Sequence, residues 1–406
     1  MRKSNTIKFF ADLPPRPDEA HLKLYKEAGF NYYILTEDYY SAVSQEYFDA
    51  ISICEKMGLG VIIRGYDGAA FPTYFNQFEG KDLNQYSGIK GFYMIDEPHA
   101  GLFDDIRKIY VKWRNEKYPQ KFWHINLFPS YATAEQLQTA ASATKTAYEQ
   151  YIDEYVDKVL AEVVGNKTIG FDHYPLIEKP EEGRYVSKTW LYDLIVVGQA
   201  AQRAKCEYSV CIQSFTDNGG WREIISTNDI RFQVYTSMAF GANAFEFFTY
   251  CTSAGLKFDA MVTNDVPTDV YYFVKEVIAE LKLFERDYLA FSWNGATTYK
   301  GKNSQSIPEA FEKIESKTLQ KLADISSVES AEDLIIGQFE NDKKQNGYIV
   351  VSYYDPSVSK SNDVRLTFAA QDEITVYKAG KKSRIKLNKN TLKITLDAGE
   401  GLFIVV

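Results

Sequence analysis

Eight short segments rich in β-branched, aromatic and aliphatic residues alternate with longer amphipathic segments between residues 6 and 289. This alternation constrains the fold most, because repeated strand–helix units bury a parallel sheet beneath a layer of helices. Eight such units predict a closed (β/α)8 barrel, or TIM barrel. The expected strands are Ile7–Asp12, Tyr32–Thr36, Gly60–Gly65, Gly91–Asp96, Phe122–Leu127, Ile169–His173, Tyr208–Ser214 and Ala244–Tyr250.

The helices between these strands carry boundary signals of their own. Pro17-Asp18-Glu19 is typical of a helix start, and Gly29 and Gly58 are typical of the two helix ends that precede the second and third strands. An open, doubly wound sheet shows the same alternation. However, no GxGxxG motif follows the first strand, which excludes the dinucleotide-binding version of that fold.

The composition of the sequence and the spacing of its apolar residues change after Leu289. A polar segment around residues 300–317 is followed by short alternating runs such as 347–352 and 364–368, with a last strand expected at Gly401–Val406. We therefore expect a barrel over residues 1–290, a connecting segment over 291–335 and a small antiparallel β-sandwich over 336–406. The sandwich contains no catalytic constellation, so its expected role is to cover or extend the barrel.

Charge and hydropathy exclude several classes of partner. The net charge is −9 and no long run of Lys or Arg occurs, which argues against nucleic acid and anionic membranes. No segment reaches the roughly 20 apolar residues of a membrane span. The expected location is the cytoplasm, or the periplasm or exterior if a signal peptide has been removed. The four cysteines are expected to be free thiols.

Polar residues cluster at the predicted carboxyl ends of the strands, where a barrel of this kind carries its active site. A barrel that served only as a scaffold would have little reason to gather acids, amides and imidazoles there. The residues concerned are Asp12, Glu37, Asp38, Arg64, Asp96, Glu97, His124, Asn126, Asp172, His173, Gln213, Glu246 and Tyr250.

The sharpest motif is Gly91–Pro98, an apolar strand that ends in Asp96, Glu97 and a proline. Pro98 restrains the residue before it, so we expect Glu97 to be extended at the mouth of the strand. Burial among aromatic rings would raise the pKa of Glu97, which is what a general acid requires. The alternative is that Asp96 and Glu97 cap the following helix.

Two further acids leave alternatives open. In Asp172-His173-Tyr174, strand alternation sends Asp172 and Tyr174 to one side and His173 to the other. Asp172 is either catalytic or orients a neighbouring base. Glu246 lies within an apolar run and is either a second catalytic carboxylate or half of a buried ion pair. No HExxH and no Gly-x-Ser-x-Gly motif occurs, so we expect no metal and no cofactor.

These segments together resemble a known group. Residues 93–98, 124–131, 171–175 and 231–235, followed by Phe248-Thr249-Tyr250, resemble bacterial glycoside-hydrolase-like proteins of the clan A barrel type, distantly like the β-galactosidase families. The resemblance implies a glycosidase that acts on an oligosaccharide or glycoside. Its implied catalytic residues are Glu97, as acid/base, with Asp172 and Glu246. Its implied substrate-binding residues are Asp96, Glu37, Arg64, His124, Asn126, His173, Tyr174, Gln213 and Tyr250.

The sequence departs from the clan A pattern at two positions. Gln213 stands where the seventh strand normally supplies the nucleophilic glutamate, and Asp96 replaces the usual asparagine before the acid. Three schemes stay open. In the first, Asp172 or Glu246 serves as the second carboxylate. In the second, the enzyme resembles hexosaminidase-type barrels, in which Asp96 would orient the 2-acetamido group of the substrate and Glu97 would protonate the leaving oxygen. In the third, the barrel binds carbohydrate without catalysis.

Overall fold

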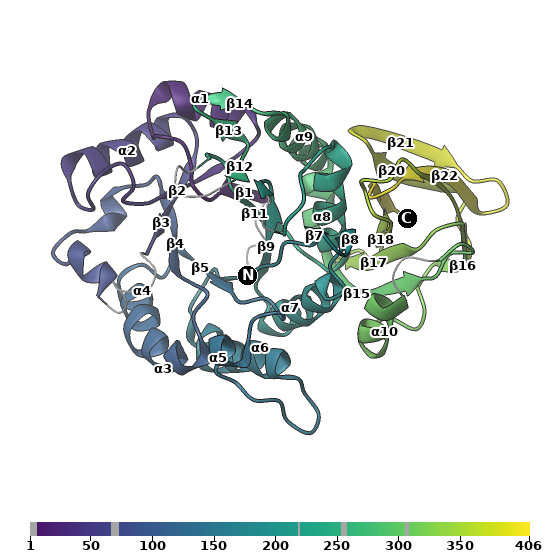
Figure 1. The fold of residues 1–406 in the computed structure, drawn as a ribbon, viewed down its shortest axis with the longest axis horizontal. Helices are drawn as coiled ribbons and strands as arrows, with labels where there is room; N and C mark the ends of the chain where they lie inside the picture. Colours follow the sequence, from purple (N-terminus) through teal and green to yellow (C-terminus); the bar gives the residue numbers. More distant parts are fainter. Residues whose placement is uncertain (1–5, 66–72, 218–219, 253–257, 305–307) are drawn as a thin grey trace.

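The fold was analysed in a computed structural model that describes residues 6–65, 73–217, 220–252, 258–304 and 308–406. Its central sheet has eight parallel strands in the order β1-β11-β9-β6-β5-β4-β3-β2, surrounded by helices (Figure 1). This arrangement confirms the predicted (β/α)8 barrel. None of the helices in the described part of the chain combines the length and the apolar character needed to cross a bilayer.

The observed strands differ from the predicted ones by one or two residues at their ends. Asp12, Thr36 and His173 fall just outside the observed strands. The strands of the barrel are β1 (Lys8–Ala11), β2 (Tyr32–Leu35), β3 (Gly60–Arg64), β4 (Ile89–Asp96), β5 (Phe122–Leu127), β6 (Thr168–Asp172), β9 (Glu207–Gln213) and β11 (Ala244–Phe248).

The helices begin and end where the predicted signals lie. Asp18 caps α1 by accepting hydrogen bonds from the backbone N–H groups of Ala20 and His21, and Gly29 follows the helix with a φ of +106°. The α-helices around the barrel are α1 (Glu19–Glu27), α2 (Gln45–Lys56), α3 (Phe103–Ile106), α4 (Lys112–Lys117), α5 (Ala134–Leu137), α6 (Ala147–Lys158), α7 (Trp190–Ala204), α8 (Thr227–Ala239) and α9 (Asp269–Leu289).

Two asparagine side chains extend the hydrogen bonding of the ring where the strands begin. Asn31, just before β2, donates from its backbone N–H to Phe9 O (3.1 Å), and its Oδ1 accepts from Phe9 N–H (2.8 Å). Asn243, just before β11, makes the same pair of bonds with Tyr208 on β9. In each pair the side-chain oxygen of the asparagine accepts a hydrogen bond that a backbone carbonyl of the neighbouring strand would otherwise accept. The bonds of Asn31 thereby join β1 to the start of β2.

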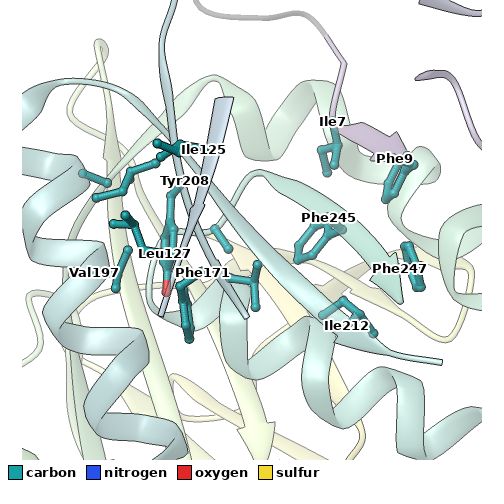
Figure 2. Packing of buried hydrophobic residues seen from close by; sticks show 14 of the residues in the cluster. Ile7, Phe9, Ile125, Leu127, Phe171, Val197, Tyr208, Ile212, Phe245 and Phe247 are labelled. Atoms are coloured by element: carbon teal, nitrogen blue, oxygen red, sulfur yellow. The ribbon is translucent and has the colours of Figure 1, made fainter. Parts of the chain in front are cut away.

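Strand alternation separates two apolar layers. Side chains on the outer face, such as Phe9, Ile125, Phe171 and Phe245, belong to the cluster that packs beneath the helices (Figure 2). The lumen contains a separate cluster of Phe10, Ile34, Ile62, Tyr93 and Phe122. The lumen is therefore filled with side chains below the mouth, as expected for an eight-stranded barrel.

The C-terminal region contains two antiparallel sheets, which confirms the predicted small β-sandwich. The segment 291–335, predicted as a connection, itself contains β15 (Phe291–Tyr299), α10 (Pro308–Ile314) and β16 (Ile325–Ser330). The six-stranded sheet has the order β15-β17-β18-β23-β20-β21 and the three-stranded sheet the order β16-β19-β22. The other strands are β17 (Leu334–Asn341), β18 (Asn346–Ser352), β19 (Ser361–Phe368), β20 (Glu373–Lys378), β21 (Lys381–Lys386), β22 (Thr391–Asp397) and β23 (Gly401–Val405).

The six-stranded sheet packs directly on α8 and α9 of the barrel (Figure 1). Phe284 of α9 stacks on Phe403 of β23 with ring centroids 5.5 Å apart, and one hydrophobic cluster extends through both regions. The close approach depends on Gly337 of β17, because a Cβ atom there would lie 2.2 Å from Ala239 O at the end of α8.

We predict that Gly337→Ala destabilises the whole chain. The added methyl group meets backbone rather than a mobile side chain, so helix and sheet must separate, at a cost of about 3 kcal/mol in the free energy of unfolding. Urea denaturation measures this loss. Ser383→Thr, which adds a methyl group on exposed β21, is the control and should change stability by less than about 0.5 kcal/mol. Equal stability of the two variants would contradict the observed packing.

Candidate active site

The mouth of the barrel gathers side chains from strands that are far apart in the sequence. The strand register pairs Asp172 of β6 with Cys211 of β9, and Cys211 with Glu246 of β11. These register partners therefore leave the sheet on the same side, toward the lumen. On the other side of the ring, Arg64 pairs in register with Tyr93 of the lumen cluster, and the register shift between Tyr93 and Asp96 lets Asp96 meet Arg64.

Arg64 is the centre of a rigid polar network. Its guanidinium group lies 2.6 Å from Asp12 Oδ1 and 3.1 Å from Asp96 Oδ2, and it covers the Tyr93 ring at 4.7 Å. The Tyr93 hydroxyl donates to Asp96 Oδ1 at 2.7 Å. Both oxygens of Asp96 thus have partners, and the Arg64 guanidinium group contacts the carboxyl groups of both Asp12 and Asp96.

Glu97 leaves the strand in an unusual backbone conformation. Its N–H still donates to Asn126 O on β5 (2.9 Å), but its φ is +43°. The prediction of an extended Glu97 was therefore wrong: Pro98 disfavours the right-handed helical region, and the chain turns into the left-handed region instead. A non-glycine residue held there costs of order 1 kcal/mol or more, and such strain is common at functional sites.

The capping role considered for Asp96 and Glu97 is also wrong. The short 3-10 helix that follows β4 spans Ala100–Leu102, and its N-cap residue is His99, with no side-chain cap bond. Asp96 and Glu97 precede it and face the mouth, where Asp96 is bound by Arg64 and Tyr93.

Asp172 and Glu97 form a coupled pair of carboxyl groups. Burial raises the pKa of Asp172 well above its usual range, and the charges of Glu97 and Asp96 raise it further. The side-chain interaction with Glu97 acts on the pKa of Asp172 in the same direction. Tyr174 also reaches the site, with its hydroxyl 3.5 Å from Asp172 Oδ2.

His124 and Glu246 lie deeper in the lumen. Glu246 is 2% exposed, and its Oε2 lies 3.4 Å from His124 Nε2. Burial, together with the charges of Lys8 and Arg64, lowers the pKa of His124 to about 3. His124 is therefore uncharged at neutral pH and does not provide the cation of a buried ion pair with Glu246.

Two predicted binding residues point away from the mouth. His173 is fully buried against α7, where it is bonded to Asp193 and Ser187. Tyr250 is 1% exposed and packs edge-on against Tyr25, with ring centroids 4.9 Å apart. The structure does not bring these side chains to the group around Glu97.

Gln213 and Glu37 are engaged in local structure. Gln213 is fully buried; its Oε1 accepts from Leu176 N–H (3.2 Å) and its Nε2 donates to Arg222 O (3.2 Å), so the amide joins two loops. Glu37, after β2, accepts from Gln77 Nε2 (3.2 Å) in the 3-10 helix that follows β3. Asn126 is buried and contributes its backbone carbonyl to Glu97.

Aromatic rings border the mouth. Tyr131, after β5, is 52% exposed and rests edge-on upon His173 at 5.0 Å. Burial, then the charges of Asp172, Asp193 and Glu97, raises the pKa of the Tyr131 hydroxyl, which places the ring near the carboxyl pair. Tyr174 contacts Trp221 edge-on with ring centroids 5.7 Å apart. Partly exposed rings beside acids suit the apolar face of a sugar.

The loop that carries Trp221 is held by ion pairs with two other parts of the chain. The neighbouring Arg222, fully buried, lies 2.7 Å from Asp229 Oδ1 on α8 and 2.6 Å from Asp355 Oδ1 in the C-terminal region. The C-terminal region therefore supports one wall of the mouth through a buried ion pair.

Sequence reasoning assigned no role to several residues that the structure brings to the mouth. Asp12 was visible as a strand end, but only the fold shows its contact with Arg64. Tyr93 sits inside an apolar strand, where an aromatic residue is expected for packing. Tyr131 and Trp221 lie on loops, which have no periodicity that reports which way a side chain points.

A cavity of ≈ 430 Å³ lies at the other end of the barrel, between α7, α8, α9 and β15. Lys205, Tyr288 and Trp293 are among its lining residues, and Glu207, the carboxylate there, forms an ion pair with Lys8. This end of a TIM barrel serves stability rather than chemistry, so we place the candidate site at the mouth. Within the described ranges, no three potential ligands are arranged to hold a metal ion.

The fold and the acid-lined mouth define this chain as a TIM-barrel protein with a site suited to proton transfer. No protein-family model and no curated protein matches the sequence. Among solved structures, alpha-galactosidase I from Mortierella vinacea is similar, with 10% identity, coverage of 95% of this chain and 89% of that chain, and a TM-score of 0.50.

Two further solved structures are similar over comparable lengths. A GH30 endoxylanase from Clostridium papyrosolvens shares 9% identity over 99% of this chain and 97% of that chain, with a TM-score of 0.48. A 4-O-α-L-rhamnosyl-β-D-glucuronidase from Fusarium oxysporum shares 9% identity over 100% of this chain and 96% of that chain, with a TM-score of 0.49. At such identities the comparisons concern the fold and not the reaction, and the likeness to β-galactosidases stays a prediction.

We predict that Asp172→Asn stabilises the protein as the pH rises. The folded state binds the Asp172 proton more tightly than the unfolded state does. At a pH above 3.8, the ordinary pKa of aspartate, the unfolded chain loses this proton, whereas the folded chain must either keep the proton or bury a negative charge. Stability attributable to Asp172 therefore falls with increasing pH, and the amide removes this penalty. Each tenfold difference in proton affinity corresponds to about 1.4 kcal/mol. Thermal unfolding should show a gain in Tm at pH 7 that shrinks toward pH 4, and a gain independent of pH would contradict the coupling.

Proposed function

We propose that this protein is a glycoside hydrolase that acts on an oligosaccharide or glycoside, with Glu97 and Asp172 as its acid/base pair. The observation that carries the proposal is the buried position of the Asp172 carboxyl group beside Glu97 at the mouth of the barrel, where burial and the charge of Glu97 raise the pKa of Asp172 well above its usual range. Such a pair titrates in two coupled steps, so it can hold a proton at neutral pH where an isolated carboxyl group cannot.

The pair would protonate the glycosidic oxygen as the bond from that oxygen to the anomeric carbon breaks. The leaving sugar departs as an alcohol, and positive charge develops on the ring that remains. The carboxylates of Asp12 and Asp96, held in place by Arg64, supply negative potential on the opposite side of the mouth. Tyr131 and Trp221 offer ring faces for the sugar.

The spacing of the pair favours a second candidate mechanism. Two-carboxylate glycosidases keep these groups about 5–5.5 Å apart for a retaining reaction, or about 6.5–9.5 Å for an inverting one, because a sugar carbon or a water lies between them. Carboxyl groups in direct contact, as we propose for Asp172 and Glu97, leave no such room. An acid and an orienting carboxyl group are able to touch when the nucleophile belongs to the substrate, as in hydrolysis assisted by a 2-acetamido group.

In that mechanism we assign Asp172, rather than Asp96, as the orienting group. Asp96 has both oxygens occupied by Arg64 and Tyr93, whereas Asp172 is bonded to the proposed acid Glu97. Glu246 would be the second carboxylate only if the substrate reached deep into the lumen, because it is 2% exposed. Binding without catalysis is the remaining alternative, supported by the structural use of Gln213.

The first test is the activity of Glu97→Gln on aryl glycosides with good and poor leaving groups. Loss of a general acid costs about 10²- to 10⁴-fold in kcat, and the loss should be smaller for a nitrophenyl leaving group, which needs little protonation. Glu280→Gln, at the buried contact of α9 with Arg231 of α8, is the control and should retain kcat. Unchanged activity of Glu97→Gln would remove Glu97 as the acid, and calorimetric sugar binding without turnover would favour the binding protein.

The second test compares nitrophenyl 2-acetamido-2-deoxy glycosides with the matching 2-hydroxy glycosides. Substrate assistance predicts that the 2-acetamido compounds are hydrolysed at least about 100-fold faster, since only they carry an internal nucleophile. Asp172→Asn should reduce this preference, because the amide cannot take up the charge that the acetamido group develops. Equal rates for both series would reject substrate assistance while leaving the hydrolase proposal intact.

A further inference from the structure

A buried carboxylate on α7 connects two segments of the mouth. Asp193 is fully buried, and its Oδ2 accepts hydrogen bonds from His173 Nδ1 (2.6 Å) and from the backbone N–H of Ser130 (3.0 Å). His173 Nε2 lies 2.8 Å from Ser187 Oγ. Ser187, His173 and Asp193 thus form one chain of hydrogen bonds, and both ring nitrogens of His173 are occupied.

Each bond of Asp193 fixes a residue that adjoins the carboxyl pair. His173 directly follows Asp172, and because the two side chains leave the strand on opposite sides, fixing the His173 ring fixes the direction of Asp172. Ser130 directly precedes Tyr131, whose ring rests on His173 at 5.0 Å. A single carboxylate therefore sets the end of β6 relative to the loop after β5.

The energetics of this carboxylate argue against a purely structural role. Burying a carboxyl group completely on an outer helix is costly, and no donor reaches Asp193 Oδ1 in the described part of the chain. Apolar residues of similar size commonly replace a buried ion pair with neutral or favourable effect on stability. Apolar residues cannot make the directional hydrogen bonds by which Asp193 fixes His173 and the backbone of Ser130.

The three side chains also have the separations of a nucleophilic Ser-His-Asp triad. Ser187 is only 6% exposed and His173 is fully buried, with Trp190 packed edge-on against the imidazole ring at 5.3 Å. A substrate carbonyl has no approach to Ser187 Oγ, so the chain of hydrogen bonds positions other groups rather than attacking.

We propose that Asp193 is a positioning residue of the active site, which holds Asp172 and Tyr131 in place through His173 and Ser130. This inference rests on the proposed glycosidase function for its kinetic readout, but the placement of Asp172 is also measurable without turnover.

The test compares Asp193→Ala with Asp193→Asn. The asparagine Oδ1 can occupy the place of Oδ2 and accept both hydrogen bonds, whereas alanine makes neither. We expect Asp193→Ala to lose about 10-fold or more in kcat, with KM changed by less than about 3-fold and with a shifted pH profile, because misplacement by about 1 Å is costly. Asp193→Asn should keep kcat within about 3-fold of the wild type.

Two additional variants separate positioning from stability. The double variant His173→Leu/Asp193→Leu replaces the buried pair by apolar groups and should fold normally, yet lose kcat as Asp193→Ala does. Glu280→Ala removes another buried carboxylate, one paired with Arg231 at the interface with the C-terminal sheets, and should lower Tm with little change in kcat. Wild-type kcat in the double variant would overturn the proposal.

The measurement that needs no turnover is the titration of Asp172. Carbon-13 labelling of aspartate carboxyl groups, with Asp172→Asn to assign the signal, reports the pKa of Asp172 in each variant. A lower pKa of Asp172 in Asp193→Ala and in the double variant supports positioning, and an unchanged pKa in both overturns it. If no glycoside is hydrolysed by the wild type, the proposed function fails while this titration still decides the role of Asp193.

Discussion

A closed ring of parallel strands is the constraint on which this structure depends. In such a ring every second side chain points into a lumen that is too narrow for anything but side chains, and the level of each one is fixed by the strand register. Residues as distant as Asp12 and Glu246 therefore face the same small space. The carboxyl groups are crowded together because of this geometry. Burial of Asp172 in this space raises its pKa, and the charges of Glu97 and Asp96 raise it further.

The strands and helices were predictable because their signals are local. Alternating apolar segments, Asp18 at a helix start and Gly29 at a helix end each report on their own neighbourhood, so they survive in the folded chain. The unpredicted features are those that depend on two segments at once. The left-handed turn at Glu97 combines the local restraint of Pro98 with the hydrogen bond from Glu97 N–H to Asn126 O on β5. The burial of Tyr250 follows from its packing against Tyr25 of α1.

The sequence predicted which residues of the candidate site lie at the ends of the barrel strands, but it did not predict which side chains contact each other. Strand ends correctly indicated that Arg64, Asp96, Glu97 and Asp172 would lie together. They did not indicate that Arg64 binds Asp12 and Asp96, or that His173, although adjacent to Asp172, faces α7. One residue along a strand reverses the direction of a side chain, so an error of one position separates a mouth residue from a buried one.

The hydrogen bonds of Gln213 limit which residues can replace it. An amide both donates and accepts, and Gln213 uses both capacities to hold Leu176 and Arg222, next to Trp221. A glutamate at this position keeps the acceptor and loses the donor, so the Arg222 carbonyl is left without its bond. A single substitution of Gln213 by glutamate would therefore loosen one wall of the mouth, and the new carboxyl group would be buried between two loops.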